Sequence, residues 1–77
     1  MYSLMKLVRG EIARQNQLWP DQDKNSQADW IVILTEEVGE VCEATLKSDH
    51  DKYVEELTHV AAVAIQMLGR AVGDEVF

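Results

Sequence analysis

Apolar side chains recur at helical spacing along three stretches of the chain, and polar side chains fill the positions between them. This spacing places the apolar residues of each stretch on one face of a helix. It predicts helices over residues 2–17, 28–47 and 51–72, separated by a polar loop at 18–27 and a short link at 47–50. No stretch has a convincing strand pattern, so the sequence predicts an all-α fold in a single domain over residues 1–77.

Residues at the predicted helix ends support these boundaries. Trp19-Pro20 ends the first helical pattern, because proline lacks the backbone N–H that a helix interior needs. Ser26 and Asp29 have the spacing of a capping box at the start of the second helix. Gly73 predicts the end of the third helix, since glycine readily adopts the left-handed conformation found after helix C-termini.

The short link between the last two helices favours an antiparallel hairpin, with the first helix packed against it. Each hairpin helix carries one continuous apolar stripe, which we expect to form the core. In the second helix this stripe lies beside a mixed one that holds acidic residues. The expected core stripes are Ile31, Leu34, Val38, Val41 and Thr45 on the second helix, and Tyr53, Leu57, Val60, Ala64, Met67, Leu68 and Ala71 on the third.

The small size of the chain predicts that it needs more than its own core for stability. Chains of about this length bury little apolar surface and commonly rely on a disulfide, a metal or a partner chain. Cys42 is the only cysteine, which excludes an internal disulfide. Because 47% of the 77 residues are hydrophobic, we expect a homo-dimer or homo-tetramer in which the helices form a four-helix-type bundle.

The formal charge of −7 restricts the choice of partners. An acidic chain is repelled by a nucleic-acid backbone or an anionic membrane, so we expect neither as the main partner. No stretch is long and apolar enough to span a bilayer, and the N-terminal residues do not resemble a signal peptide. With its single thiol, the chain is typical of a reducing environment, and we expect it in the cytoplasm.

Acidic residues gather on one side of each hairpin helix. Glu36, Glu37 and Glu40 are spaced three and four residues apart, so they lie within one turn of the same helical side. On the third helix, Glu56 and His59 have the same spacing. At a rise of about 1.5 Å per residue, the two groups lie at similar distances from the hairpin turn. The spacing therefore predicts a facing cluster of three carboxylates and an imidazole.

Such a cluster suits a divalent cation. Carboxylates crowded beside an apolar interface must either take up protons or bind a cation. Hard cations such as Mg²⁺ and Mn²⁺ prefer carboxylate oxygens, and bound Mg²⁺ retains waters that phosphates can replace. The chemistry favoured by the residues is metal-dependent hydrolysis of a phosphate compound. The alternative is a helical hairpin whose acidic turns only improve solubility.

Two phrases of the sequence resemble a known family. T-E-E-V-G-E-V-C-E-A at 35–44 and E-E-L-T-H-V at 55–60 are similar to the MazG-like all-α nucleoside triphosphate pyrophosphohydrolases, which carry E-x-x-E on one helix and E-x-x-D on the next. The resemblance covers roughly residues 30–69. It implies hydrolysis of an NTP or dNTP to its monophosphate and pyrophosphate in a homo-oligomer. It further implies that Glu37, Glu40 and Glu56 bind Mg²⁺ and that Glu36 is the general base.

His59 departs from the family pattern, which has Asp at this position. A neutral imidazole binds Mn²⁺ or Zn²⁺ but is a poor ligand for Mg²⁺. His59 is therefore either a fourth metal ligand, with Mn²⁺ as the possible ion, or a helix-surface or interface histidine bonded to Glu55 four residues earlier. Lys52 is a candidate for contacts with substrate phosphates, and Trp19 and Trp30 for stacking on a base, although all three side chains also suit structural roles.

Two rival functions stay open at this point. One is a binding module, in which the same helices hold metal or nucleotide without turnover because His59 spoils the site. The other is a purely structural oligomerisation domain.

Overall fold

The computed structural model describes residues 3–73 and contains helices and turns in that range, with no strand. The prediction of an all-α fold is therefore confirmed. The elements are α1 (Leu4–Leu18), the short 3₁₀ helix η1 (Gln22–Lys24), α2 (Gln27–Leu46) and α3 (His50–Val72). All three α-helices begin and end within a few residues of the predicted bounds. The predicted first residue of the first helix, Tyr2, lies outside the described residues.

Side-chain caps define where the hairpin helices begin. At the start of α2, the Ser26 hydroxyl accepts a hydrogen bond from the backbone N–H of Asp29, and the Asp29 carboxylate accepts one from the N–H of Ser26. The Asp49 carboxylate accepts from the backbone N–H of Lys52 at the start of α3. Each cap satisfies a helix N–H that has no partner within the helix. At the other end of α3, Gly73 has the expected left-handed conformation, with φ +77°.

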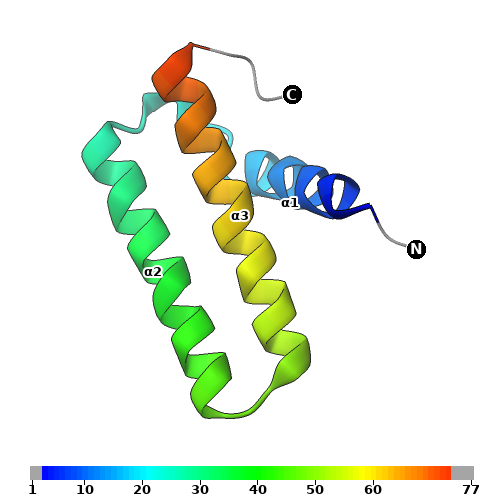
Figure 1. Cartoon of the computed structure of the whole chain (residues 1–77). Coiled ribbons are helices and arrows are strands. Elements are labelled where there is room, and N and C mark those ends of the chain that lie inside the picture. The colour runs from blue at the N-terminus through cyan, green and yellow to red at the C-terminus, as the bar shows by residue number, and fades with distance from the viewer. Residues whose placement is uncertain (1–2, 74–77) are drawn as a thin grey trace.

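The link between α2 and α3 makes the hairpin. Ser48 has a positive φ of 54°, and the backbone N–H of Asp49 donates to the carbonyl of Ala44. The chain therefore reverses within three residues, and α2 and α3 run antiparallel along one another (Figure 1). The two helices share the largest set of tertiary contacts in the molecule.

Helix α1 packs against α3 and crosses the hairpin rather than extending it (Figure 1). Ile12 and Gln15 of α1 are buried there. The loop that follows α1 is tied to the end of α3 by an ion pair of 2.9 Å between the Arg70 guanidinium and the Asp23 carboxylate. The same guanidinium lies 4.7 Å from the centre of the Trp30 ring, an arrangement typical of a cation–π contact.

The packing of the hairpin differs from the sequence-based expectation. The side that faces α1 and the opposing hairpin helix, here called the inner face, buries Trp30 and Ala44 of α2 together with Val63 of α3. Three polar side chains are buried with them, namely Gln15, Glu56 and Gln66. The mixed stripe of α2, rather than its continuous apolar stripe, therefore packs inside the chain.

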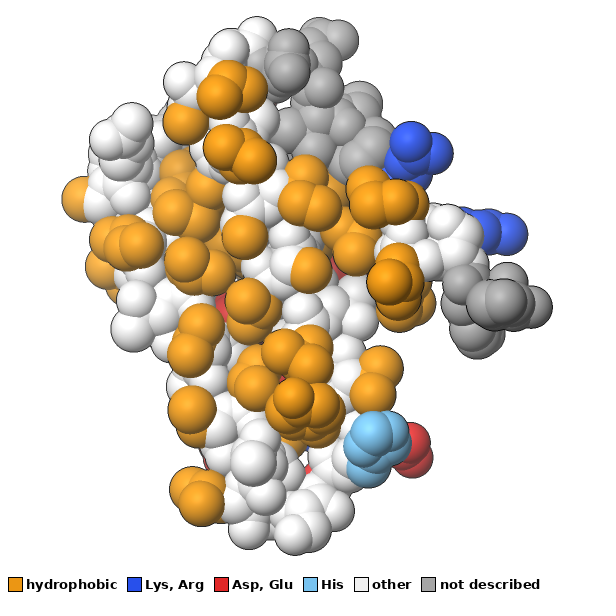
Figure 2. All heavy atoms as spheres, in the orientation of Figure 1, with side chains coloured by type: hydrophobic (Ala, Val, Ile, Leu, Met, Phe, Trp, Pro, Cys, Tyr) orange, Lys and Arg blue, Asp and Glu red, His pale blue; other side chains and the backbone are white. Residues whose placement is uncertain are grey.

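The expected core stripes are largely exposed. Ile31 and Val38 on α2 are 51% and 43% exposed, and Leu57 and Leu68 on α3 are 40% and 63% exposed. These four residues define what we call the outer face. Figure 2 shows apolar side chains spread over both helices on this face, with charged side chains mainly at its margins. The prediction that these stripes form the core of the chain is wrong, because one crossing helix covers only one side of the hairpin.

The hydropathy of the described helices shows whether any of them could cross a membrane. Within residues 3–73, none of the helices combines the length and the apolar character needed to cross a bilayer.

Candidate metal centre

The hairpin brings together the four residues that the sequence predicted at similar distances from the hairpin turn. One donor atom from each of four side chains lies within 4.8 Å of the donor atoms of the other three. Two of the residues come from α2 and two from α3, one helical turn apart in each case. The prediction of a facing cluster of three carboxylates and an imidazole is therefore confirmed as geometry. We refer to this set as the acid cluster, and it consists of Glu37, Glu40, Glu56 and His59.

His59 lies at the centre of the contacts. Its Nδ1 is 3.1 Å from a carboxylate oxygen of Glu56 and 3.3 Å from one of Glu37. Its Nε2 faces the opposite way, 3.4 Å from the Arg14 guanidinium and 3.6 Å from a carboxylate oxygen of Glu11, both on α1. The ring therefore points into the cluster, as expected for a metal ligand. The alternative pairing with Glu55 is wrong, because His59 contacts Glu56 and Glu37 while Glu55 pairs with Lys52.

Behind His59 lies a polar network that the sequence did not indicate. The Glu11 carboxylate is buried and accepts two hydrogen bonds of 2.8 Å from the Arg14 guanidinium. It also accepts one from the side-chain amide of Gln15, whose own oxygen accepts from Gln66 on α3. Burial acts to raise the pKa of Glu11, but hydrogen bonds from Arg14 and Gln15 and the charge of His59 hold it below the ordinary value. From sequence alone, Glu11 and Arg14 are indistinguishable from a surface ion pair.

Crowding of the carboxylates shifts their protonation. A hydrogen bond shared with Glu56, together with burial and the nearby charge of Glu37, raises the pKa of Glu40 to about 7. Burial also acts to raise the pKa of Glu56, but the hydrogen bond from Glu40 and the contacts with His59 and Lys52 bring it below its ordinary value. Below about pH 7, Glu40 and Glu56 therefore hold one proton between them when no cation is bound.

One oxygen of the acid cluster lacks a satisfactory partner. Oε2 of Glu37 is buried and forms no hydrogen bond within residues 3–73. Nδ1 of His59 lies 3.3 Å from it but faces Glu56 at the shorter distance of 3.1 Å. A buried carboxylate oxygen without a donor costs free energy, and a cation among the four side chains would remove that cost.

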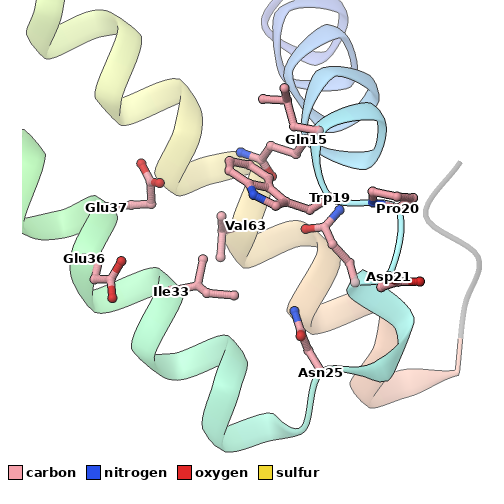
Figure 3. A pocket seen from close by; sticks show the side chains of 11 residues that line it. Gln15, Trp19, Pro20, Asp21, Asn25, Ile33, Glu36, Glu37 and Val63 are labelled. Atoms are coloured by element: carbon pink, nitrogen blue, oxygen red, sulfur yellow. The ribbon is translucent and has the colours of Figure 1, made fainter.

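A cavity of about 470 Å³ opens beside the acid cluster (Figure 3). Glu36 and Glu37 of α2 stand on one wall, and Trp19 and Asn25 come from the segments on either side of η1. Ligand pockets in proteins commonly have volumes of about 300–1,000 Å³ and few polar groups. The cavity thus has the size of a small-molecule site and reaches the acid cluster at Glu37.

The structure separates the remaining predicted site residues. Glu36 lines the cavity next to the acid cluster but is not one of its four members. Lys52 stands at the edge of the cluster, with its ammonium 3.0 Å from Glu55 and 3.5 Å from Glu56. Trp19 is 55% exposed and lines the cavity. Trp30 is only 3% exposed and does not line this cavity, so its placement favours the structural role.

Comparison with protein-family models, with characterised proteins and with solved structures finds no match for this chain. The resemblance to MazG-like enzymes therefore stays a prediction, and the geometry described above has to support any functional proposal by itself.

Proposed function

We propose that this chain is a metal-dependent nucleoside triphosphate pyrophosphohydrolase of the MazG-like kind, which converts an NTP or dNTP to the monophosphate and pyrophosphate. The observation that carries the proposal is the acid cluster, where donor atoms from two helices converge within 4.8 Å beside a ligand-sized cavity. The unpartnered oxygen of Glu37 and the proton shared by Glu40 and Glu56 both support a site that takes a cation.

Glu37, Glu40 and Glu56 are the residues that would hold Mg²⁺ or Mn²⁺. Such an ion, when bound, polarises phosphoryl oxygens and stabilises their charge. An ion on Nδ1 of His59 would leave an N–H at Nε2, with the Glu11 carboxylate at 3.6 Å as its acceptor. The Arg14 guanidinium, 3.4 Å from the same nitrogen, can only donate and would have to turn away from it. Because imidazole favours Mn²⁺ over Mg²⁺, His59 shifts the expected preference of this chain toward Mn²⁺.

Glu36 is the proposed general base. Its carboxylate stands on the cavity wall, directly before the first residue of the acid cluster. There it would take a proton from a water whose oxygen attacks the α-phosphorus, while the bond from that phosphorus to the bridging oxygen breaks and pyrophosphate leaves. Lys52, at the rim of the cluster, would lose its contact with Glu56 and pair with a substrate phosphate.

Self-association is part of the proposal. The outer face exposes Ile31, Val38, Leu57 and Leu68 on two adjacent helices. Contiguous apolar patches on this scale commonly mark protein interaction sites. A second copy packing its own outer face on this one would complete a four-helix arrangement and bury the stripes that the sequence assigned to the core.

A nucleotide panel tests the activity. All common NTPs and dNTPs are incubated with the chain under Mg²⁺ and under Mn²⁺, and released pyrophosphate is measured. We expect release with at least one nucleotide, a higher rate with Mn²⁺, and loss of release in Glu40→Gln. Glu43→Gln is a matched control, because Glu43 lies on the same helix but pairs with Lys47 outside the acid cluster. Metal-independent release, or none with any nucleotide, would contradict the proposal.

A nucleotide-binding module without turnover is the second candidate, and the contacts of His59 favour it. The ring lies against Glu37 and Glu56 and supplies a positive partner when protonated, so it competes with a metal ion. His59→Asp distinguishes the two functions, since it removes this competitor and adds a hard oxygen ligand. Pyrophosphate release that arises only in the variant would identify the natural chain as a degenerate site.

A further inference from the structure

The cavity beside the acid cluster has two chemically different ends. Glu36 and Glu37 stand at one end, where the proposed reaction takes place, and Trp19 and Asn25 come from the segments around η1 (Figure 3). A ligand whose phosphates reach the acid cluster would therefore place its remaining part among the residues around η1. The identity of those residues decides what that part can be.

Trp19 provides a flat surface for the part of the ligand that lies away from the acid cluster. More than half of this indole is exposed, although it lines a cavity whose other walls include the apolar side chains of Ile33 and Val63. An exposed tryptophan at a cavity binds planar heteroaromatic groups well, because stacking buries apolar area on both partners.

The amides of the cavity are not equivalent. The Gln15 amide donates to Glu11 and its oxygen accepts from Gln66. The Gln22 amide donates to the side-chain oxygen of Asn16. The side-chain amide of Asn25 has no hydrogen bond within the described residues, and only its backbone N–H is engaged, with the carbonyl of Gln22. Asn25 is thus the cavity amide with both its donor and its acceptor available to a ligand.

From this arrangement we infer that Asn25 reads the edge of the nucleobase and determines base preference, while Trp19 holds the base by stacking. A carboxamide offers an N–H beside a C=O, and this pair matches a base edge that presents an acceptor beside a donor. The inference rests on the proposed function in that it takes the ligand to be a nucleotide. It assigns the specificity-determining contact to the loop before α2 rather than to the acid cluster.

Binding of noncleavable nucleotides tests the inference without depending on turnover. The probes are the α,β-methylene analogues of ATP, GTP, CTP and UTP, titrated with Mn²⁺ into the full chain by calorimetry. In Asn25→Ala, we expect about tenfold weaker binding of the preferred analogue and a smaller difference in affinity among the four analogues. This loss corresponds to the base discrimination that one bidentate amide contact supplies. The affinity for inorganic pyrophosphate, which has no base, should stay within about twofold of the wild-type value on this account.

Gln27→Ala is the matched control, because it removes an exposed amide two residues away that does not line this cavity. An Asn25→Ala variant with the same ranking of analogues, or with equal losses for the analogues and for pyrophosphate, overturns the inference and leaves the proposed function standing. If no analogue binds to the wild type, the inference is also overturned. If the analogues bind with Asn25-dependent preference but ATP, GTP, CTP and UTP are not cleaved, the inference holds and the proposed reaction fails.

Discussion

The two faces of the hairpin reverse the usual distribution of side chains. The inner face buries charged and amide groups, among them Glu56 at 3% exposure and Gln66 at 1%. The outer face exposes large apolar residues such as Ile31 and Leu68, each more than half accessible. Buried polar groups are tolerated only when they are bonded or bind an ion, and exposed apolar patches usually contact a partner. Each face therefore supports a different part of the proposal.

On the inner face, the component that we propose is a cation. Hydrogen bonds connect the side chains of Glu11, Gln15 and Gln66, whereas the neighbouring acid cluster leaves Oε2 of Glu37 without a hydrogen bond and raises the pKa of Glu40 to about 7. Within the described residues, the inner face leaves two buried side-chain atoms without a hydrogen bond, namely Oε2 of Glu37 in the acid cluster and the indole nitrogen of Trp30 near the start of α2. On the outer face, the component that we propose is a second copy of the hairpin.

The largest expected effect comes from charging the outer face. Ile31→Lys combined with Leu68→Lys places two ammonium groups in the proposed contact between copies, where they would be buried without partners. We expect dimer dissociation to become easier on the order of a thousandfold, since each loss of about 1.4 kcal/mol is a factor of ten. Light scattering after gel filtration at several concentrations measures the mass.

Leu4→Lys is the control for this experiment, because it makes the same change at an exposed position of α1. A wild-type chain that is monomeric at all concentrations would contradict self-association through the outer face. A charged variant that associates as well as the wild type would contradict it too. Retention of helical circular dichroism in the variant shows that the individual hairpin still folds.

Removing cluster carboxylates should have the next largest effect. We expect Glu40→Ala and Glu56→Ala each to weaken Mn²⁺ binding by about a hundredfold, because loss of even the outer-shell partners of a metal costs about 10–100-fold in affinity. If the two side chains share one ion, the double variant should be little worse than either single variant. Calorimetric titration gives the three affinities, and strictly additive losses would indicate two independent sites.

A smaller effect should follow from disturbing the bonded part of the inner face. Gln66→Leu leaves the side-chain oxygen of Gln15 buried without its donor. We expect the free energy of unfolding to fall by about 1–3 kcal/mol, the usual cost of an unsatisfied buried group. Denaturant unfolding measures the change. Thr58→Ala is the comparison, because its hydroxyl only bonds the Val54 carbonyl within α3, so an equal loss there would show that the buried amide pair is unimportant.

The smallest predicted effect is a pH dependence centred on Glu40. Its pKa of about 7 means that Mn²⁺ must displace a proton below neutrality, so affinity should fall about tenfold per pH unit below about 7 and level off above it. Because the pKa in the folded chain exceeds the ordinary value, the contribution of this group to metal-free stability is present at low pH and is lost as pH rises through about 7.

Glu40→Gln separates this titration from other groups, since glutamine cannot lose a proton. The metal-free variant should melt at a temperature that changes less between about pH 5 and 8 than that of the wild type, and saturating Mn²⁺ should abolish the wild-type decline. Identical profiles for wild type and variant would rule out the shared proton.

Local sequence features were sufficient for much of this structure. The Ser26–Asp29 capping box, the Gly73 stop and the short link through Ser48 predicted the helices and their antiparallel pairing. The acid cluster followed from counting residues back from that link, because helix rise is constant. These predictions succeeded because each depends on nearby residues or on regular geometry.

What the sequence could not indicate depends on the position of α1. The position of α1 determines which stripe of the hairpin is covered. This helix packs on the side of Glu56 and Gln66, and the more apolar side of Leu57 and Leu68 stays exposed. The position of α1 also brings Glu11 next to His59, although the sequence around Glu11 suggests only an ion pair with Arg14. Which stripes of two helices meet is a property of the whole fold, and apolar periodicity does not specify it when two stripes compete.

Paramagnetic broadening by Mn²⁺ tests most directly whether the two hairpin helices share one ion. Substoichiometric Mn²⁺ is added to isotopically labelled chain, and the loss of backbone amide signals is followed by NMR. The account predicts that the turns around Glu37–Glu40 and Glu56–His59 lose intensity together and first, and that Glu40→Gln with Glu56→Gln prevents this loss. Broadening spread over the exposed acids of the hairpin link, or confined to one helix, would contradict a shared metal site.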